Sequence, residues 1–385
     1  MSRIKIATIV GARPQFIKAA AISRVFTNDY TGKVDEIIIH TGQHYDDNMS
    51  KVFFDEMEIP QPRYHLEVGS GMHGHMTGEI IRKTEEVLLQ EKPEMVIVYG
   101  DTNTTLGGAI AASKIHIPVA HIEAGLRSFN KSMPEEINRI LCDHVSTLLF
   151  SPTETGLKNL IKEGFRTDST PPYSADNPNI YHCGDVMYDN SLYFAGKAEK
   201  NSAVLKDLGL ENREYALCTI HRDSNTDQPE RLIAILSALD RITREFHLPI
   251  VLPVHPRTSK MIAALPDQDL VQKLHQNSLF IRTAPVGYLD MLLLEKNSRV
   301  ILTDSGGVQK ESYFFKKPCI VLRAETEWKE LVEHGAARLA DANSEKIMEI
   351  FRYYYQNPPQ NFPTLYGNGE SAKFICSEII SFLYQ

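Results

Sequence analysis

Short apolar runs alternate with amphipathic stretches along this chain, and this alternation restricts the possible folds more than any other feature. Runs rich in Ile and Val come at Ile4–Val10, Glu36–Thr41, Met95–Tyr99, Val119–Ile122 and Thr147–Phe150. Uninterrupted apolar runs of this length are typical of parallel strands that are covered on both faces. The stretches Phe16–Phe26 and Gly78–Leu89 are long enough to be crossover helices between such strands. The first half therefore predicts a doubly wound α/β domain.

The same alternation resumes after a polar, Pro-rich passage at residues 166–179. The second series of runs comprises Tyr215–Ile220, Ile250–Val254, Leu279–Ile281, Val300–Thr303 and Cys319–Leu322. A chain of 385 residues also exceeds what one hydrophobic core usually organises. We therefore expect an α/β fold with two Rossmann-like, doubly wound parallel-sheet domains. Ligands of such sheets bind beyond the carboxyl ends of the strands, so the residues that follow each strand are the candidates for function.

Composition argues against several classes of function. The formal net charge of −8 repels polyanions, which argues against nucleic acid as a partner. No apolar run approaches the ~20 residues that a membrane span requires, and the opening residues suit a charged strand rather than a signal sequence. The cysteines are scattered, so we expect reduced core residues and no metal site: Cys142, Cys183, Cys218, Cys319 and Cys376. These features predict a cytoplasmic protein without membrane insertion.

Ionisable residues follow several strands of the first series. Arg13 and Lys18 lie in the first turns of the expected first helix, where they could bind an anion or remain solvated surface charges. Asp101 and Glu123 follow two later strands, and Glu135 opens another helix. A single acid in such a place is more often a helix cap or an ion-pair partner. Three acids near one edge of the sheet favour proton-transfer chemistry.

The second series offers two histidines and a candidate phosphate-binding turn. His221 and His255 follow two strands, where an imidazole can exchange protons near neutral pH. The stretch Thr303–Glu311 combines the end of a strand, small residues and a helix start. The small residues are Ser305, Gly306 and Gly307. Glycines let the backbone approach a pyrophosphate, the helix N-terminus adds N–H groups, and Glu311 could accept hydrogen bonds from a ribose. A plain tight turn is the alternative.

Seven motifs occur in the order seen in one family: Arg13-Pro14 with Lys18, Gly42-Gln43-His44, Gly100-Asp101-Thr102, residues 121–127, residues 134–139, His221-Arg222 and Ser305-Gly306-Gly307. On these motifs the chain resembles the non-hydrolysing UDP-N-acetylglucosamine 2-epimerases over essentially its whole length. The resemblance implies a glycosyltransferase-B-like fold, a homodimer and a reaction without a cofactor. It also implies a first domain at 1–190 and a UDP-binding domain at 191–366. Residues 367–385, with a final helix at Ser371–Leu383, would pack back on the first domain.

The family's reaction converts UDP-N-acetylglucosamine to UDP-N-acetylmannosamine. A base removes the C2 proton, UDP leaves to give a 2-acetamidoglycal, and UDP adds again after reprotonation from the other face. The resemblance assigns proton transfer to Asp101, Glu123 and Glu135, and a diphosphate contact or proton relay to His221. It assigns substrate binding to Arg13 and Lys18 at phosphate, Glu311 at ribose, Val286 and Met291 at uracil, and also to Gln43, His44, Arg139, His255, Ser305, Gly306 and Gly307.

Several positions depart from the family pattern, among them Ala12 beside Gln15, and Asp46 and Gly74 at a second nucleotide site known in some members. Gln15 and Lys310 replace residues that are often acidic, and Trp328 stands where an arginine is usual. The variants are similar to the branch that acts on UDP-2,3-diacetamido-2,3-dideoxyglucuronate for surface polysaccharide synthesis, which is an alternative substrate. A UDP-sugar glycosyltransferase, a hydrolysing epimerase and a non-catalytic sugar-nucleotide sensor are further alternatives. The cluster of acids weighs against the transferase and the sensor.

Overall fold

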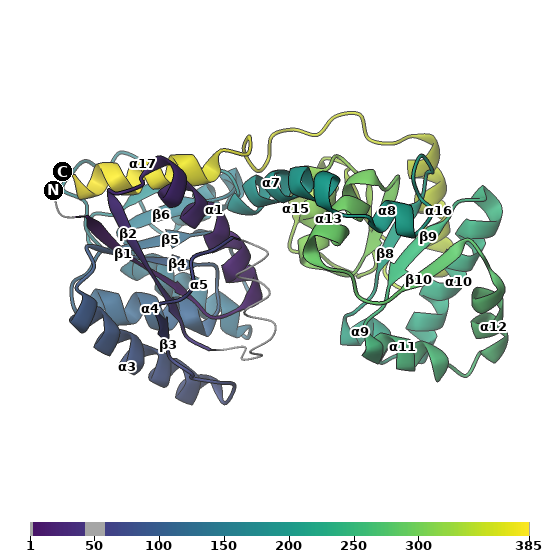
Figure 1. Ribbon diagram of the computed structural model, residues 1–385, viewed down its shortest axis with the longest axis horizontal. Coiled ribbons are helices and arrows are strands. Elements are labelled where there is room, and N and C mark those ends of the chain that lie inside the picture. The colour runs from purple at the N-terminus through teal and green to yellow at the C-terminus, as the bar shows by residue number, and fades with distance from the viewer. Residues whose placement is uncertain (1–2, 43–57, 385) are drawn as a thin grey trace. The chain divides into compact units, whose positions relative to one another are not determined.

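The computed structural model describes residues 3–42 and 58–384. Two compact units make up the chain: residues 1–190 with 364–385 form the first unit, and residues 191–363 form the second. Each unit contains a parallel sheet with helices on its faces (Figure 1). The predicted α/β class, with two doubly wound parallel sheets, is therefore confirmed.

A seven-stranded parallel sheet forms the centre of the first unit. Its strands are β1 (Ile4–Val10), β2 (Val34–His40), β3 (Tyr64–His65), β4 (Met95–Tyr99), β5 (Val119–Ile122), β6 (Leu148–Ser151) and β7 (Asn179–His182). Their order in the sheet is β3-β2-β1-β4-β5-β6-β7, and neighbouring strands are parallel. The five predicted strands are confirmed, with small shifts at their ends. The edge strands β3 and β7 were not predicted, because they are short and polar.

Helices cover both faces of this sheet. They are α1 (Arg13–Asp29), α3 (His73–Glu91), α4 (Asn103–Lys114), α5 (Pro134–Val145), α6 (Glu154–Lys162) and α17 (Ser371–Leu383), while α7 (Val186–Asn201) contains the boundary with the second unit. Helix α17 packs beside α1, and α3, α4 and α5 lie together on the other face (Figure 1). The chain therefore returns to the first unit at its last helix, whose Ile375, Cys376 and Ile379 are buried.

Six parallel strands form the sheet of the second unit. They are β8 (Ala216–Thr219), β9 (Ile250–Pro253), β10 (Phe280–Thr283), β11 (Val300–Thr303), β12 (Cys319–Val321) and β13 (Ala337–Leu339), in the order β10-β9-β8-β11-β12-β13. The helices are α8 (Val204–Asp207), α9 (Asp223–Thr226), α10 (Pro229–Phe246), α11 (Pro256–Ala263), α12 (Gln268–Gln276), α13 (Tyr288–Asn297), α14 (Gly306–Phe314), α15 (Lys329–Glu333) and α16 (Ser344–Gln356). The five predicted strands are confirmed, and the edge strand β13 was not predicted.

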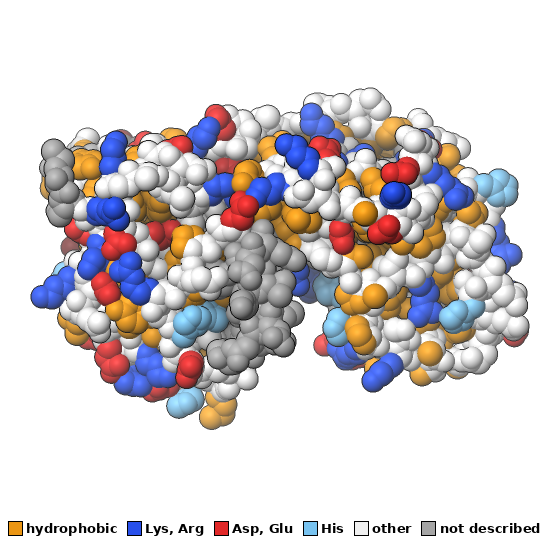
Figure 2. All heavy atoms as spheres, viewed as in Figure 1, with side chains coloured by type: hydrophobic (Ala, Val, Ile, Leu, Met, Phe, Trp, Pro, Cys, Tyr) orange, Lys and Arg blue, Asp and Glu red, His pale blue; other side chains and the backbone are white. Residues whose placement is uncertain are grey.

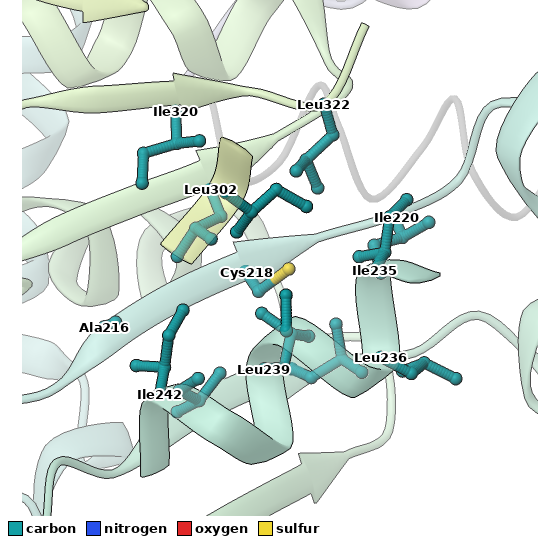
Figure 3. Packing of buried hydrophobic residues seen from close by; sticks show 14 of the residues in the cluster. Ala216, Cys218, Ile220, Ile235, Leu236, Leu239, Ile242, Leu302, Ile320 and Leu322 are labelled. Atoms are coloured by element: carbon teal, nitrogen blue, oxygen red, sulfur yellow. The ribbon is translucent and has the colours of Figure 1, made fainter. Parts of the chain in front are cut away.

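Alternating side chains of the second sheet fill two cores. Ala216, Cys218 and Leu302 pack with helix α10 on one face (Figure 3). Leu217 and Ile301 belong to a separate cluster with α13 and α14. The buried apolar residues of α10 recur three or four positions apart: Leu232, Ile235, Leu236, Leu239 and Ile242. Burying one such side chain contributes roughly 1.5–3 kcal/mol, so packing on the sheet stabilises this helix more than its intrinsic propensity does.

The strand order reverses once in each sheet. The chain crosses to the other side of β1 when it forms β4, and to the other side of β8 when it forms β11. The two neighbouring strands at such a reversal are followed by connections that run in opposite directions. This leaves room for a ligand at the carboxyl ends of the two strands. The segments that follow β1, β4, β8 and β11 are therefore the places to look for a site.

Acidic and basic side chains are interspersed on the face that Figure 2 shows. Ion pairs within helices contribute to such a surface, for example those of Arg82 with Glu79 and Glu86 on α3. Among residues 3–42 and 58–384, no helix is long and apolar enough to cross a membrane.

Candidate active site

The Gln15 side chain ties the segment after β1 to the end of β4. Its Oε1 accepts hydrogen bonds from the Gly11 and Ala12 amides at 2.9 and 3.1 Å. Its Nε2 donates to the Tyr99 carbonyl oxygen at 2.9 Å and to Thr105 Oγ1 at 3.0 Å. Gln15 is buried, and its amide is hydrogen-bonded at both ends within the protein: Oε1 at the start of α1, and Nε2 at the end of β4 and in α4.

Four charged side chains meet at the carboxyl ends of β1, β4 and β5. Lys18 of α1 pairs with Glu123, and both side chains are largely buried. Arg139 of α5 pairs with Asp101 and, at 3.1 Å, with Glu136. The charges of Lys18, Arg139 and Glu123 all act on the Asp101 carboxyl. The structure thus brings four of the predicted residues together as a cluster of alternating sign.

The backbone around these acids adopts conformations that few residues tolerate. Glu123 has a φ of +79°, which is left-handed and uncommon for a residue with a side chain. Gly100 precedes Asp101 and has a φ of +66°. A Cβ atom at Gly100 would lie 3.0 Å from Glu123 Oε2 and 3.1 Å from Lys18 Nζ. Gly100 is therefore required for its conformation and for the space that the ion pair occupies. Such outliers cluster at functional sites.

The environment of Asp101 suits proton transfer. Burial raises the pKa of Asp101 above its ordinary range, and the Arg139 guanidinium offsets this rise only in part. The negative charge of Glu123 acts in the same direction as burial. A carboxyl whose pKa is raised exchanges protons more readily near neutral pH. Asn138 of α5 donates to the Asp101 carbonyl oxygen at 2.8 Å, which joins that helix to the same loop.

The two glutamates at the start of α5 lie in different surroundings. Glu136 is buried and accepts hydrogen bonds from the Ser128 and Phe129 amides at 2.8 and 2.9 Å. Burial by itself raises the pKa of Glu136, but these amides outweigh it and hold the pKa below its ordinary value. Glu135, the acid predicted to act, is exposed. Glu136 therefore fixes the loop that precedes α5, whereas the Glu135 carboxylate is accessible from solvent.

In the second unit, His221 and Asp304 form a pair at the ends of β8 and β11. His221 Nδ1 lies 3.0 Å from Asp304 Oδ1. The buried Asp304 carboxylate also accepts hydrogen bonds from the Arg222 amide at 3.1 Å and from Asn225 Nδ2 at 3.0 Å. Burial by itself raises the pKa of Asp304, but these partners outweigh it and lower the pKa. An ionised Asp304 places the proton of His221 on Nδ1, so Nε2 is left to face a ligand.

Helix α14 begins at the glycines that were predicted to approach a pyrophosphate. Ser305 caps this helix, and its Oγ accepts a hydrogen bond from the Val308 amide at 3.4 Å. A Cβ at Gly306 would lie 2.4 Å from Glu327 Oε1, so only glycine fits there without movement. A Cβ at Gly307 would meet no atom closer than Ser305 Oγ at 3.8 Å, so this glycine borders open space. An anion can approach the first turn of α14 from that side.

Two acidic side chains lie beyond this turn. Glu311 of α14 is nearly buried, and its charge acts on Glu295 of α13. Glu295 is fully buried, and within residues 3–42 and 58–384 neither of its carboxyl oxygens has a hydrogen-bond partner. Burial first, and then the Glu311 charge, raise the pKa of Glu295 well above its ordinary value. Burial therefore disfavours the charged form of Glu295, and Glu311 is the carboxylate of this pair that could accept from a ribose.

Lys310 and Trp328, two of the departures from the family pattern, contact one another. Lys310 is only 5% exposed, and its Nζ lies 4.4 Å from the centroid of a Trp328 ring. Trp328 Nε1 donates to the Gly306 carbonyl oxygen at 2.9 Å. Thr326 Oγ1 donates to Gln309 Oε1 at 2.6 Å. The segment that contains Thr326 and Trp328 therefore packs along the start of α14.

The other predicted residues lie close to strand ends. Arg13 is exposed at the first residue of α1, and His255 is exposed at the N-cap of α11. Val286 precedes α13 and Met291 lies near its start, and both are partly buried against a core cluster of the second unit. Two predicted substrate-binding residues fall outside the described part of the chain: Gln43 and His44.

The sequence predictions missed residues that hold these groups in place. Asp304 directly follows a buried strand, and that position is a signal that could have identified it. His121 and Asp143 offer no such signal, because one lies within a strand and the other within a helix. In the described ranges 3–42 and 58–384, no three His, Cys, Asp or Glu side chains are grouped so that they could hold a metal ion.

The sequence was compared with models of known protein families, to identify the family that has two such sheets with charged residues after the strands. A model of the family described as UDP-N-acetylglucosamine 2-epimerase matches residues 28–380. This chain belongs to the UDP-N-acetylglucosamine 2-epimerase family. The matched range includes most of both units, and it confirms the resemblance predicted from the sequence.

Individual family members match almost the whole chain. The UDP-2,3-diacetamido-2,3-dideoxy-D-glucuronate 2-epimerase of Pseudomonas aeruginosa is 47% identical, over 97% of this chain and 98% of the relative. The UDP-N-acetylglucosamine 2-epimerase of Methanocaldococcus jannaschii is 43% identical, over 97% of this chain and 98% of the relative. A crystal structure of the latter enzyme with UDP-GlcNAc and UDP matches at a TM-score of 0.79 and 42% identity, covering 98% of this chain and 100% of that chain. The names of both relatives describe a 2-epimerase, but they differ in the sugar they are named for.

Proposed function

We propose that this protein is a non-hydrolysing 2-epimerase that interconverts UDP-N-acetylglucosamine and UDP-N-acetylmannosamine. The observation that carries the proposal is the cluster of Asp101, Glu123, Lys18 and Arg139 at the strand ends of the first unit, on a chain of this family. A sugar-nucleotide sensor would need the turn at α14 but no pair of acids in the other unit. A glycosyltransferase has no C2 proton to move, so this cluster weighs against it as well.

The proposed reaction is redox-neutral. A carboxylate removes the proton from C2 while the C1–O bond to UDP breaks, and the C–H electron pair forms the C1=C2 bond of a 2-acetamidoglycal. An acid then returns a proton to C2 from the opposite face, and a phosphate oxygen of UDP bonds to C1 again. The proton and the UDP are both returned, so this balance requires no cofactor.

We assign the steps to residues of both units. Asp101, Glu123 and Glu135 transfer protons, and His221, oriented by Asp304, contacts the leaving diphosphate or relays a proton to it. Losing an acid–base or charge-stabilising group of this kind costs ~100-fold or more in turnover. We assign binding of the substrate to Arg13, Lys18, Gln43, His44, Arg139 and His255, of the diphosphate to Ser305, Gly306 and Gly307, of the ribose to Glu311, and of the uracil to Val286 and Met291.

Proton NMR of the enzyme with UDP-N-acetylglucosamine in deuterated water tests the proposal. We expect the 2-epimer to form and deuterium to enter C2 of both sugars. Full retention of protium at C2 would rule out the elimination. Release of UDP with free sugar would instead identify a hydrolysing enzyme. An Asp101→Asn variant should lose exchange and product formation together, because both need the same proton transfer.

UDP-2,3-diacetamido-2,3-dideoxyglucuronate is a second candidate substrate. The 47% identical relative from Pseudomonas aeruginosa, which is named for this sugar, favours it. The measurement is kcat/KM for the two UDP-sugars under the same conditions. A preference of about tenfold or more for the neutral sugar, roughly 1.4 kcal/mol, would exclude the uronate, and the reverse ratio would establish it.

We also propose that the protein is a homodimer that uses the outer face of α5. Met133, Ile137 and Leu141 recur four residues apart on this face, and they are 39%, 45% and 44% exposed. Their spacing forms an apolar stripe on the helix that also carries Glu135. A second copy of the chain would cover this stripe. Light scattering after gel filtration should give a dimer for the wild type and a monomer for Ile137→Lys. The matched control is Ile161→Lys, because Ile161 is equally exposed, at 46%, on another helix.

We further propose a cytoplasmic location and a role in surface polysaccharide synthesis. All five cysteines are free, as is usual in reducing compartments. Cell fractionation tests the location. Analysis of the polysaccharide from cells that lack the protein tests the role, and we expect the epimerised sugar to be missing from it.

A further inference from the structure

A buried ion network lies next to the acids of the first unit. His121 of β5 uses both ring nitrogens: Nδ1 lies 2.6 Å from Asp143 Oδ1, and Nε2 lies 2.8 Å from the Gly100 carbonyl oxygen. Asp143 Oδ2 accepts hydrogen bonds from the Gly125 amide at 3.1 Å and from Arg127 at 2.7 Å. The side chains of His121 and Asp143 are fully buried. Strands β4 and β5 and helix α5 are thereby joined at one point.

This geometry requires protons on both ring nitrogens of His121. A carbonyl oxygen can only accept, so Nε2 donates to Gly100. The Asp143 carboxylate, which is paired with Arg127, would repel an unprotonated Nδ1, so that nitrogen donates as well. Burial by itself lowers the pKa of His121, but the contacts with Cys142 and Asp143 outweigh burial and raise the pKa well above its ordinary value. His121 is therefore a buried imidazolium whose charge Asp143 balances.

The network contacts a stretch of backbone that contains left-handed residues on both sides of the acids. Three residues here are left-handed, with φ angles of +66° at Gly100, +79° at Glu123 and +80° at Gly125. Glycine adopts such angles freely, but at Glu123, which has a side chain, the conformation persists only when the surroundings over-determine it. His121 holds the carbonyl group that directly precedes Asp101. Asp143 holds the amide two residues beyond Glu123. Each acid therefore has a network hydrogen bond on the backbone beside it.

We propose that His121 and Asp143 are positioning residues that hold the Asp101 and Glu123 carboxyls in the geometry needed for proton transfer at C2. This inference rests on the proposed function. Neither residue need touch the substrate, because each acts through the backbone next to an acid. Misplacing a reacting group by about 1 Å can cost about 100-fold in rate. Loss of the network should therefore lower kcat. The affinity for the UDP part should change little, because we assign the uracil, the ribose and the turn that approaches the diphosphate to residues of the second unit.

The protonation state is tested on the wild-type protein with ¹⁵N-labelled histidine. We expect both ring nitrogens of His121 to carry protons at about pH 8, well above the ordinary histidine pKa. The His121→Gln spectrum, which lacks this signal, provides the assignment. A neutral tautomer would overturn the proposal. This measurement does not depend on activity. A wild-type protein that epimerises no UDP-sugar would refute the proposed function and leave the result on His121 standing.

The positioning role is tested by the turnover of His121→Gln and Asp143→Asn. We expect kcat to fall by about 10–100-fold in each, while KM stays within about threefold of the wild type. The matched control is His40→Gln, because His40 is also buried in the same sheet but contacts His65 instead of this network. The control should lose stability but keep kcat within about twofold. The proposal is wrong if Asp143→Asn keeps full kcat, or if the control loses as much as the two variants.

Discussion

Replacing Gly100 with alanine tests whether the close approach of the backbone to the Lys18–Glu123 ion pair matters for the site. Gly100 has a φ of +66°, and a left-handed conformation costs an alanine roughly 1–2 kcal/mol relative to glycine. In a domain of about 150–250 residues, each kcal/mol lowers Tm by about 2–4 °C. Backbone strain alone should therefore lower the Tm of Gly100→Ala by several degrees.

The new methyl group should act on the site more than on stability. It would lie 3.0 Å from Glu123 Oε2 and 3.1 Å from Lys18 Nζ, which are tighter than ordinary contacts. Both atoms are at the ends of flexible side chains, so they can move by a few tenths of an ångström at little cost in folding free energy. That movement displaces a proposed catalytic carboxylate, and we expect kcat to fall by about 10–100-fold.

Gly209→Ala provides the matched control. Gly209 has a φ of +65°, and a Cβ there would meet nothing within 4 Å, so this variant carries the backbone strain without the contact. Calorimetry should show a similar fall in Tm for both variants. Only Gly100→Ala should lose turnover of the UDP-sugar, followed by NMR. Equal turnover in the two variants would show that the ion pair tolerates the displacement and that our account of Gly100 is wrong.

Three further predictions concern buried ionisable groups. Asp304→Asn removes the carboxylate that fixes the Nδ1 proton of His221, and we expect kcat to fall by about 100-fold while calorimetry still detects UDP binding. The pKa of Glu295 is raised on folding, so the unfolded state loses this proton first and stability falls as the pH rises above about 4.5. Glu295→Gln should remove this slope in urea titrations, and an unchanged slope would contradict the raised pKa of Glu295. Burial, and then the charge of His65, lower the pKa of His40 to about 4. Because the unfolded state then takes up this proton first, stability should fall by up to about 3 kcal/mol from pH 7 to pH 4. Urea titrations of His40→Gln should lack this loss.

The strands, and the edge of the sheet where the site lies, could be predicted from the sequence. The local pattern of apolar residues is sufficient to identify both. Met95–Tyr99 is a continuous apolar run, which is typical of a strand covered on both faces, and Asp101 comes two residues after its end. Parallel strands point their carboxyl ends to one edge, so acids after different strands converge without any knowledge of their contacts. Asn179–His182 has no such pattern, because this edge strand is polar and only partly buried.

The contacts among the site residues could not be predicted, because they join positions far apart in the sequence. Lys18 and Glu123 are separated by 105 positions, and no local pattern relates them. His121 lies inside a strand whose burial suggests a core residue, and its charged state follows only from the acceptors at both ring nitrogens. Glu135 and Glu136 are adjacent and chemically identical. Their different surroundings depend on the path of the loop that contains Ser128.

The sequence alone also could not decide between the two candidate substrates, because the contacts of the variant residues were unknown. Gln15 and Lys310 replace residues that are often acidic in the family, and a loss of negative charge at both positions would favour a substrate with an additional anion. The Gln15 amide is instead used within the protein at the start of α1, so it adds no charge that a ligand would meet. Lys310 is buried against Trp328 beside the first turn of α14. A lysine and an anion ~4 Å apart attract each other by up to ~4 kcal/mol before desolvation, at an effective dielectric constant near 20. That turn is the proposed diphosphate site, and the diphosphate is common to both sugars. Any effect of the Lys310 charge on the diphosphate would therefore be the same for both substrates, and we expect selection of the uronate to come from residues that contact the sugar ring itself.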